Sequence, residues 1–306
     1  MRVLFAGSPE VALPTLRAIH SSRHALVGVL SQPARPVGRK KVLTPTAVAR
    51  HCETSEIPLA TPNSAVELRE AVGAWEPDIA IVIAYGRILG QEELAIVPKG
   101  WWNVHFSLLP RWRGAAPVPY ALAEGDSETG LSIFRIEEGL DTGPIAASLA
   151  HPIAPHDTSQ TLLTKLSELA PDPVLELLDQ AEAQDVVTEP QRGTPSYAPK
   201  PSGDVGELTF SDPAGALYNR YRAWRDEPGC FVRRDDNGQR VKIMSAWVDP
   251  DHGALRPGEL APVRDGVAVG TSTTALILSK VQPAGKAVMD AGDWLRGLPG
   301  GIQLRA

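Results

Sequence analysis

The sequence predicts an α/β domain with a mostly parallel sheet, followed by a smaller domain of antiparallel strands. In residues 1–150, apolar strand-like runs alternate with amphipathic helical stretches, a pattern typical of βαβ units. The run "PDIAIVIAYG" at 77–86 is apolar almost throughout, as expected for a central parallel strand buried on both faces. Beyond residue 206, short strand-like runs are separated by turn signals. We therefore expect a Rossmann-like N-terminal domain and an OB-like C-terminal β-barrel.

The predicted elements follow the chain in a regular order. In the first domain, strands are expected at 2–7, 25–31, 77–86, 100–106 and 130–136, and helices at 9–22, 64–75 and 158–184. Pro171 and Pro173 indicate a kink or a break within the last of these stretches. In the second domain, a helix is expected at 214–224 and strands at 230–234, 240–248, 266–272 and 275–282.

A shift in composition marks the boundary between the two domains. The stretch "TEPQRGTPSYAPKPSGDVG" at 188–206 is rich in Pro, Gly, Ser and Thr and shows no periodicity. Its prolines favour a semi-extended linker. We therefore predict a first domain at 1–188, a linker at 189–206 and a C-terminal domain at 207–306.

Composition excludes several classes of protein. Apolar residues make up 43% of the 306 positions and charged residues 22%, which is typical of a globular protein and not of a disordered one. No stretch is long and apolar enough for a transmembrane helix, and we interpret the N-terminal run as a first strand and not as a signal peptide. Cys52 and Cys230 form no disulfide framework and match no metal-ligand spacing, so we expect the reducing cytoplasm.

Positive charge is concentrated in one short segment of an acidic chain. The formal net charge is −6, yet the segment 32–50 holds several basic residues and no acidic one. These residues are Arg35, Arg39, Lys40, Lys41 and Arg50. A local cluster of this kind suits a polyanionic partner that touches one face of the protein, although a solvated basic loop explains it equally well.

The nucleotide-binding and nucleophile motifs of common α/β enzymes are absent from the sequence. The first strand ends in "AGSPE", without the glycines that let a backbone approach a dinucleotide pyrophosphate. There is no Walker loop, no Gly-x-Ser-x-Gly elbow, and no His-Glu-x-x-His or clustered Cys/His motif. We therefore expect no metal, and a ligand other than a dinucleotide at the carboxyl ends of the strands.

One stretch, "NVHFSLLPRWRGAAP" at 103–117, combines a hydrogen-bonding pair with an apolar loop and positive charge. Because side chains alternate along a strand, Asn103 and His105 project from the same face at a strand end. The amide offers two donors, and the imidazole can move a proton near neutral pH. Asp141 lies in a tight "GLDTG" loop after the next strand, where its carboxylate could orient His105 or transfer a proton itself.

Each of these three residues also has an ordinary structural interpretation. Asn103 could cap a turn, His105 could be a hydrogen-bonded core histidine, and Asp141 could serve the turn alone. Taken together, an amide, an imidazole and a carboxylate without a Ser or Cys nucleophile favour direct transfer to an incoming nucleophile through a tetrahedral oxyanion.

The motif and the "GLDTG" loop resemble those of the formyltransferases that use 10-formyltetrahydrofolate. Further segments extend the resemblance over nearly the whole chain: "FAGSPE", "SQPARPVGRKK", "IAYGRIL", "SYAPKPS" and "QPAGKAVM". The resemblance implies that Asn103, His105 and Asp141 are catalytic. Two loops are expected to contact the folate donor, and their residues are Ser107, Leu108, Leu109 and Pro110, and Tyr85, Gly86, Arg87, Ile88 and Leu89.

In their full form, the motifs resemble the branch of this family that acts on charged tRNA. They imply transfer of the formyl group of 10-formyltetrahydrofolate to the α-amine of methionyl-initiator-tRNA, by a monomer without a metal. Arg111 and Arg113 could meet the glutamate tail of the donor or the RNA phosphates, and we favour the phosphates. The expected tRNA-binding residues are Arg35, Arg39, Lys40, Lys41, Arg111 and Arg113, with a second contact from the C-terminal domain.

The chain departs from the family pattern at three places. Phe106 follows the histidine where the family usually has Gly or Ala, and its ring could narrow the pocket. The basic segment has Ala34 and Lys40 where an acidic residue and a glycine are common. The stretch "RDEPGCF" at 225–231 replaces the usual Asn-Pro-Trp-Pro-Gly. The last two departures concern the tRNA surface and not the chemistry.

Other functions fit parts of the same pattern. A free small amine, such as an amino-sugar nucleotide or glycinamide ribonucleotide, could replace tRNA as the acceptor, and water could do so in a folate hydrolase. A non-enzymatic RNA-binding scaffold would need a broken set of catalytic residues, whereas all three are present. The basic segment and the C-terminal domain favour tRNA, because an enzyme for small molecules has less use for either.

Overall fold

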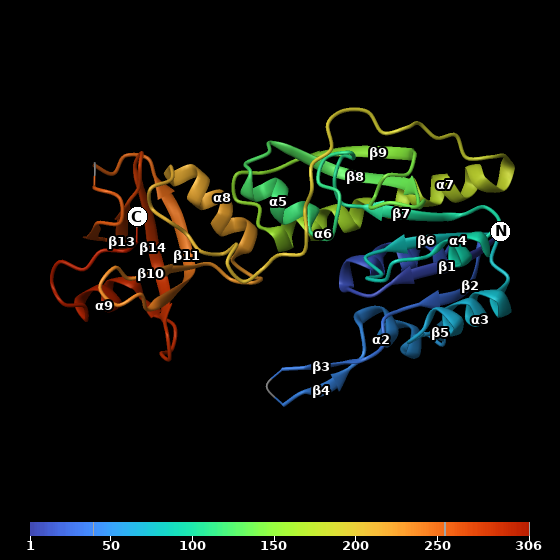
Figure 1. Cartoon of the computed structure of the whole chain (residues 1–306), viewed down its shortest axis with the longest axis horizontal. Coiled ribbons are helices and arrows are strands. Elements are labelled where there is room, and N and C mark those ends of the chain that lie inside the picture. The colour runs from blue at the N-terminus through green and yellow to red at the C-terminus, as the bar shows by residue number, and fades with distance from the viewer. Residues whose placement is uncertain (39, 254, 306) are drawn as a thin grey trace. The chain divides into compact units, whose positions relative to one another are not determined.

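The computed structural model describes residues 1–38, 40–253 and 255–305, and the chain divides into two compact units (Figure 1). The first unit holds Met1–Pro117, Glu128–Pro152 and Leu163–Ala198. The second unit holds Val118–Ser127, Ile153–Leu162 and Pro199–Ala306, so it includes two short segments from the N-terminal half. The domain boundaries expected at 188 and 206 remain a prediction.

The first unit is built on a seven-stranded sheet in the order β5-β2-β1-β6-β7-β8-β9. Its strands are β1 Arg2–Gly7, β2 Ala25–Leu30, β5 Leu59–Ala60, β6 Ile79–Ile83, β7 Trp101–His105, β8 Glu128–Arg135 and β9 Ile145–Pro152. The strands from β5 to β7 pair in parallel, which confirms the expected mostly parallel sheet. β6 is buried at every position, in keeping with its unbroken apolar sequence.

The last two strands of this sheet correct one expectation. β8 pairs antiparallel to β7, with Asn103 opposite Phe134 and His105 opposite Ser132, and β9 pairs antiparallel to β8. The prediction that the strand at 130–136 continues the parallel series is therefore wrong. An apolar run indicates burial but carries no information on strand direction, so the sequence pattern could not reveal the reversal.

The helices of the first unit flank this sheet, and two of them begin at side-chain caps. They are the short 3-10 turn Glu10–Ala12, α1 Leu13–His20, α2 Ala47–Thr54, α3 Ala65–Trp75, α4 Gln91–Ala95 and α7 Pro171–Ala183. Two more, α5 Pro117–Ala123 and α6 Ser159–Leu169, cross the boundaries between the units. The side chains of Thr46 and Ser64 accept backbone hydrogen bonds at the starts of α2 and α3. Leu68 of α3 joins Leu4 and Leu30 of the sheet in one core cluster.

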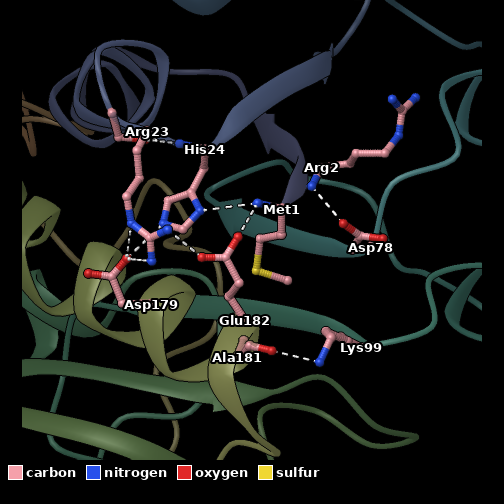
Figure 2. Close-up of polar contacts among 10 residues, drawn as sticks. Met1, Arg2, Arg23, His24, Asp78, Lys99, Asp179, Ala181 and Glu182 are labelled. Carbon is pink, nitrogen blue, oxygen red and sulfur yellow. Dashed lines mark hydrogen bonds and ion pairs between the residues drawn. The ribbon is translucent and has the colours of Figure 1, made fainter.

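A polar cluster ties the end of α7 to the residues that precede β2 and β7 (Figure 2). Arg23 Nη2 lies 2.8 Å from Asp179 Oδ1, and the buried ring of His24 contacts the same carboxylate oxygen at 3.0 Å. Lys99 Nζ donates to the Ala181 carbonyl over 2.6 Å. The hydrogen bond from Arg23 lowers the pKa of Asp179, but both side chains are largely exposed, so this pair alone adds little stability. Together, these contacts hold the C-terminal end of α7, at Asp179 and Ala181, against the residues that precede β2 and β7.

The second unit contains an antiparallel sheet in the order β10-β11-β14-β13-β12, with β15 paired to β14. Its strands are β10 Phe231–Arg233, β11 Arg240–Asp249, β12 Leu260–Val263, β13 Gly266–Gly270, β14 Ala275–Pro283 and β15 Met289–Asp290, and its helices are α8 Ala214–Trp224 and α9 Ala291–Arg296. This pairing confirms the expected antiparallel C-terminal domain. Within the unit, the buried Arg222 of α8 donates to the Ala154 carbonyl over 3.1 Å and so holds the segment 153–162.

Candidate active site

β7 presents the predicted imidazole and amide at its carboxyl end. His105 is 6% exposed, and its Nε2 lies 2.8 Å from the carbonyl oxygen of Trp112. Because a carbonyl can only accept, Nε2 carries the proton and Nδ1 keeps its lone pair in the neutral ring. Asn103 is half-buried, and no group in the described part of the chain hydrogen-bonds its side chain. The imidazole can therefore accept a proton at Nδ1, and the amide can donate to a ligand.

Asp141 approaches this imidazole from the loop between β8 and β9. Its Oδ2 lies 3.8 Å from His105 Nδ1 and accepts a hydrogen bond of 2.7 Å from the backbone N–H of Gly114. At that separation the carboxylate attracts a protonated ring without bonding to it directly. Asp141 lies in the loop after the next strand, as expected, but that strand, β8, runs antiparallel to β7 and so ends at the other edge of the sheet. The loop 136–144 instead doubles back to bring Asp141 to His105.

The surroundings of His105 favour the neutral imidazole. Burial lowers its pKa below the ordinary value of about 6.5, and the Asp141 charge and the Trp112 carbonyl oppose this shift without cancelling it. The ring is therefore ready to accept a proton at pH 7. Once it is protonated, the nearby carboxylate stabilises the new charge.

Buried hydrogen bonds hold the loop 107–110, the first predicted folate loop, in one shape. The fully buried Ser132 of β8 donates from Oγ to the Ser107 carbonyl over 2.8 Å and accepts from the Leu109 N–H over 3.1 Å. Ser107 Oγ in turn donates to the Arg111 carbonyl over 2.6 Å. The sequence pattern gives no sign of Ser132, because its place opposite His105 becomes visible only in the antiparallel register.

The side chains of the second predicted folate loop, residues 85–89, differ widely in their exposure to solvent. Tyr85 is 2% exposed and packs in the core, so only its backbone can face a ligand. The same burial raises the pKa of its hydroxyl. Leu89 packs partly against the same core, whereas Ile88 is 94% exposed, an unusual state for a large apolar side chain. Gly86 and Arg87 line a cavity of about 400 Å³. The other residues that line it are Gln32, Pro33, Arg35, Pro62 and Asn63.

The basic segment forms a β-hairpin, a structure that its sequence pattern did not indicate. Its strands are β3 Arg35–Val37 and β4 Val42–Thr44, which pair antiparallel. Gly38, at a φ of 71°, begins the turn between them, which explains how two valine-containing stretches can pair across so short a connection. Lys40 and Lys41 lie exposed in this turn, and Arg39 lies outside the described residues.

The two arginines of the motif have different neighbours. Arg111 lies over the Trp112 ring, with its Cζ 4.6 Å from the ring centre. Arg113 donates from Nε and Nη2 to Gln191 Oε1, over 3.2 and 2.6 Å. Gln191 was not predicted as a site residue, because it lies in the stretch expected to be a linker. Phe106, the departure next to the histidine, is buried, at 6% exposed.

The described residues include neither a cluster of three possible metal ligands nor a readily ionised thiol. Among the described residues, no group of three His, Cys, Asp or Glu side chains is placed to hold a metal ion. Separately, no helix in the described part of the chain is long and apolar enough to cross a membrane. Burial raises the pKa of Cys52 to about 11 and that of Cys230 to about 12. Both cysteines are therefore unreactive thiols near pH 7.

The fold is that of an α/β enzyme, and the site brings together groups that are able to transfer a proton and to donate a hydrogen bond to a developing negative charge. A buried neutral imidazole, a carboxylate within 3.8 Å of it and an amide two residues away along the same strand are the groups that such chemistry requires.

The chain belongs to the formyl transferase family. The family's formyl transferase domain matches residues 1–178, and its C-terminal domain matches residues 202–299. The methionyl-tRNA formyltransferase of Renibacterium salmoninarum is 42% identical over 97% of this chain and 97% of its own length. That of Thermus thermophilus is also 42% identical, over 97% of this chain and 96% of its own length.

Solved structures of lower identity share the fold. WlaRD, a sugar 3N-formyl transferase, matches with a TM-score of 0.69 at 16% identity, over 94% of this chain and 99% of its own. A methionyl-tRNA formyltransferase from Clostridium thermocellum matches with a TM-score of 0.59 at 16% identity, over 82% of this chain and 95% of its own. HypX from Aquifex aeolicus, solved with tetrahydrofolic acid, matches with a TM-score of 0.65 at 18% identity, over 97% of this chain and 48% of its own.

Proposed function

We propose that this enzyme transfers the formyl group of 10-formyltetrahydrofolate to the α-amine of methionyl-initiator-tRNA. Relatives that are 38% to 42% identical over 97% of the chain carry the name of a methionyl-tRNA formyltransferase. The observation that carries the proposal is the His105 Nδ1 lone pair, 3.8 Å from the Asp141 carboxylate and on the same strand face as the Asn103 amide. The basic hairpin and the second unit favour tRNA over a free small amine.

The proposed reaction is a direct transfer through a tetrahedral intermediate. The acceptor amine attacks the formyl carbon, so that a C–N bond forms and the carbonyl oxygen becomes an oxyanion. The Asn103 amide donates to that oxygen, an interaction typically worth about 10²–10³ in rate. His105 Nδ1 removes the amine proton, and the bond between the formyl carbon and N10 then breaks while the same proton passes to N10 of the leaving tetrahydrofolate. Such proton transfer typically contributes about 10²–10⁴, and no bond to the enzyme forms.

Asp141 stabilises the imidazolium that exists between the two proton transfers. The backbone N–H of Gly114 holds the carboxylate, so it faces His105 Nδ1 without occupying the lone pair. This assignment makes His105 the base next to the substrate and Asp141 its electrostatic partner.

The two predicted folate loops supply different kinds of contact. The loop 107–110 offers a wall whose shape Ser132 maintains, and the exposed side chain of Ile88 offers apolar surface to the flat pterin. Phosphate contacts from tRNA come from the hairpin and from Arg111. Arg113 is hydrogen-bonded to Gln191.

The test uses the purified enzyme, 10-formyltetrahydrofolate, and either methionyl-tRNA or a free amino-sugar nucleotide. Release of tetrahydrofolate should require methionyl-tRNA, with an equal amount of formylmethionyl-tRNA formed. Release that requires the amino-sugar nucleotide would identify a small-amine transferase, and release without any acceptor would identify a hydrolase. Either result would refute the proposal.

A further inference from the structure

One side chain in the predicted linker connects the two loops of the candidate active site. Gln191 Nε2 donates to the carbonyls of Asp141 and Gly143, over 2.8 and 2.9 Å. Its Oε1 accepts both hydrogen bonds from the Arg113 guanidinium, over 3.2 and 2.6 Å. A single half-buried amide thereby uses both of its donor hydrogens and both acceptor positions of its oxygen.

The Asp141 loop needs an external contact of this kind. Since β8 is antiparallel to β7, residues 137–143 must leave the sheet and return toward His105, whereas Ile136 and Pro144 still make backbone hydrogen bonds to β7 and β8. Asp141 has a φ of 51°, in the left-handed region that is costly for a residue with a side chain. At Gly143, a side chain would collide with the Arg135 carbonyl. Backbone carbonyls in such a loop require partners, and Gln191 supplies them for Asp141 and Gly143.

The backbone on both sides of Gln191 is anchored to the same two parts of the first unit. Glu189 and Ile145 exchange two backbone hydrogen bonds of 2.8 Å at the start of β9. Farther along, Ser196 Oγ accepts from the backbone N–H of Trp112 over 2.9 Å. The segment 189–198 therefore contacts β9 at one end and the motif loop, residues 105–114, at the other, with Gln191 between these contacts.

We propose that Gln191 is a positioning residue, which sets the distance between the Asp141 carboxylate and His105 Nδ1 by joining the Asp141 loop to the motif loop. The reaction that it serves rests on the proposed function, whereas the geometry rests on the contacts above. Gln191 touches no reacting atom and acts through Asp141. Arg113 belongs to the same framework, as the partner that orients the Gln191 amide.

Two substitutions separate the contacts of Gln191. Gln191→Ala removes all of them. Gln191→Glu keeps the size of the side chain and its acceptor for Arg113, but it removes both donors to the Asp141 loop. Gln184→Ala is the matched control, because Gln184 is an exposed glutamine in the same segment of chain after α7.

Both Gln191 variants should lose about 10–10² in kcat, with the KM for methionyl-tRNA nearly unchanged, because a small displacement of a catalytic group lowers the chemical step. Gln184→Ala should keep the wild-type kcat. Loss in Gln191→Ala with full activity in Gln191→Glu would show that only the Arg113 contact matters, and it would overturn the role assigned here.

Titration of His105 by NMR without substrates distinguishes failure of this inference from failure of the proposed function. Asp141 raises the pKa of the buried imidazole, so a carboxylate that moves away should lower the pKa in Gln191→Ala. Asp141→Asn should also lower it, and the double variant should show no further change. If the alanine variant does not fold, Gln191→Met, of similar size, replaces it in both measurements.

An unchanged His105 titration together with an unchanged kcat in Gln191→Ala would overturn the positioning role. A wild-type enzyme that formylates nothing, while Gln191→Ala still shifts the His105 titration, would refute the proposed reaction and leave the positioning role standing.

Discussion

Two segments of the first unit that carry predicted substrate contacts, the motif loop 105–114 and the hairpin 35–44, are held in opposite ways. Side chains from other parts of the unit hydrogen-bond the motif loop, and these side chains are Ser132, Asp141, Gln191 and Ser196. The hairpin rests on the pairing of β3 with β4. Its large apolar side chains stay in solvent, with Val37 56%, Val42 60% and Leu43 68% exposed.

If the proposed function is correct, this difference separates the chemistry of the enzyme from its recognition of tRNA. Proton transfer and oxyanion stabilisation require groups held within a fraction of an ångström, and the motif loop is fixed accordingly. Contact with a phosphate backbone depends on charge more than on fixed geometry, so a weakly held hairpin is sufficient. Substitutions in the first segment should therefore lower kcat, whereas those in the second should raise the KM for tRNA.

The largest effect is expected from His105→Ala. Loss of the base at Nδ1 should lower kcat about 10²–10⁴-fold in single-turnover assays. His20→Ala, at an exposed histidine on α1, is the control and should leave kcat unchanged. Turnover at the wild-type level in a folded His105→Ala protein would refute the proposed mechanism and the division of roles between the motif loop and the hairpin.

The pH dependence of kcat/KM should reflect the motif loop and not the hairpin, because His105 belongs to the motif loop. Burial lowers the pKa of His105, so the acid limb of kcat/KM should lie below about 6.5. Asp141→Asn removes a charge that raises this pKa, so it should move the limb to still lower pH and reduce the maximal rate. Because the folded pKa is below the unfolded one, the stability that His105 contributes is fully present above about pH 6.5 and is lost as the pH falls from that value through the lower folded pKa. A limb above pH 6.5 in the pH–rate profile would contradict this account.

An intermediate effect is expected from Ser132→Ala. The change leaves the buried N–H of Leu109 without its partner, which should cost about 1–3 kcal/mol of unfolding free energy. It should also raise the KM for 10-formyltetrahydrofolate more than that for methionyl-tRNA. Denaturant titration and steady-state kinetics measure the two effects. Ser55→Ala, at an exposed serine just after α2, is the control and should change neither.

The smallest effect on the folded enzyme is expected from neutralising the hairpin. Lys40→Ala with Lys41→Ala should raise the KM for methionyl-tRNA and reduce its salt dependence by a slope of about 2 on logarithmic axes. Because both side chains are exposed, stability should stay within about 0.5 kcal/mol and kcat should not change. Arg17→Ala, at an exposed position on α1, should leave the salt dependence intact. A fall in kcat from the hairpin variant would show that the hairpin takes part in the chemistry.

Short-range patterns predicted much of this structure. Alternation along one strand places Asn103 and His105 on the same face, and Pro171 marks the break between α6 and α7. The direction of β8 could not be predicted in this way, since a buried strand has the same apolar composition whichever way it runs. The hairpin was missed for a related reason, because its pairing depends on two short stretches of ordinary composition.

The sequence by itself determined which chemical groups are present, which of them share a strand face, and that an α/β domain precedes an antiparallel one. Only the tertiary structure decided that Asp141 meets His105, that the Trp112 carbonyl assigns the ring proton to Nε2, and that an amide from the predicted linker joins the two loops. The physical reason is that periodicity reports on neighbours a few residues apart. A hydrogen bond between loops depends on where the whole chain has carried each partner.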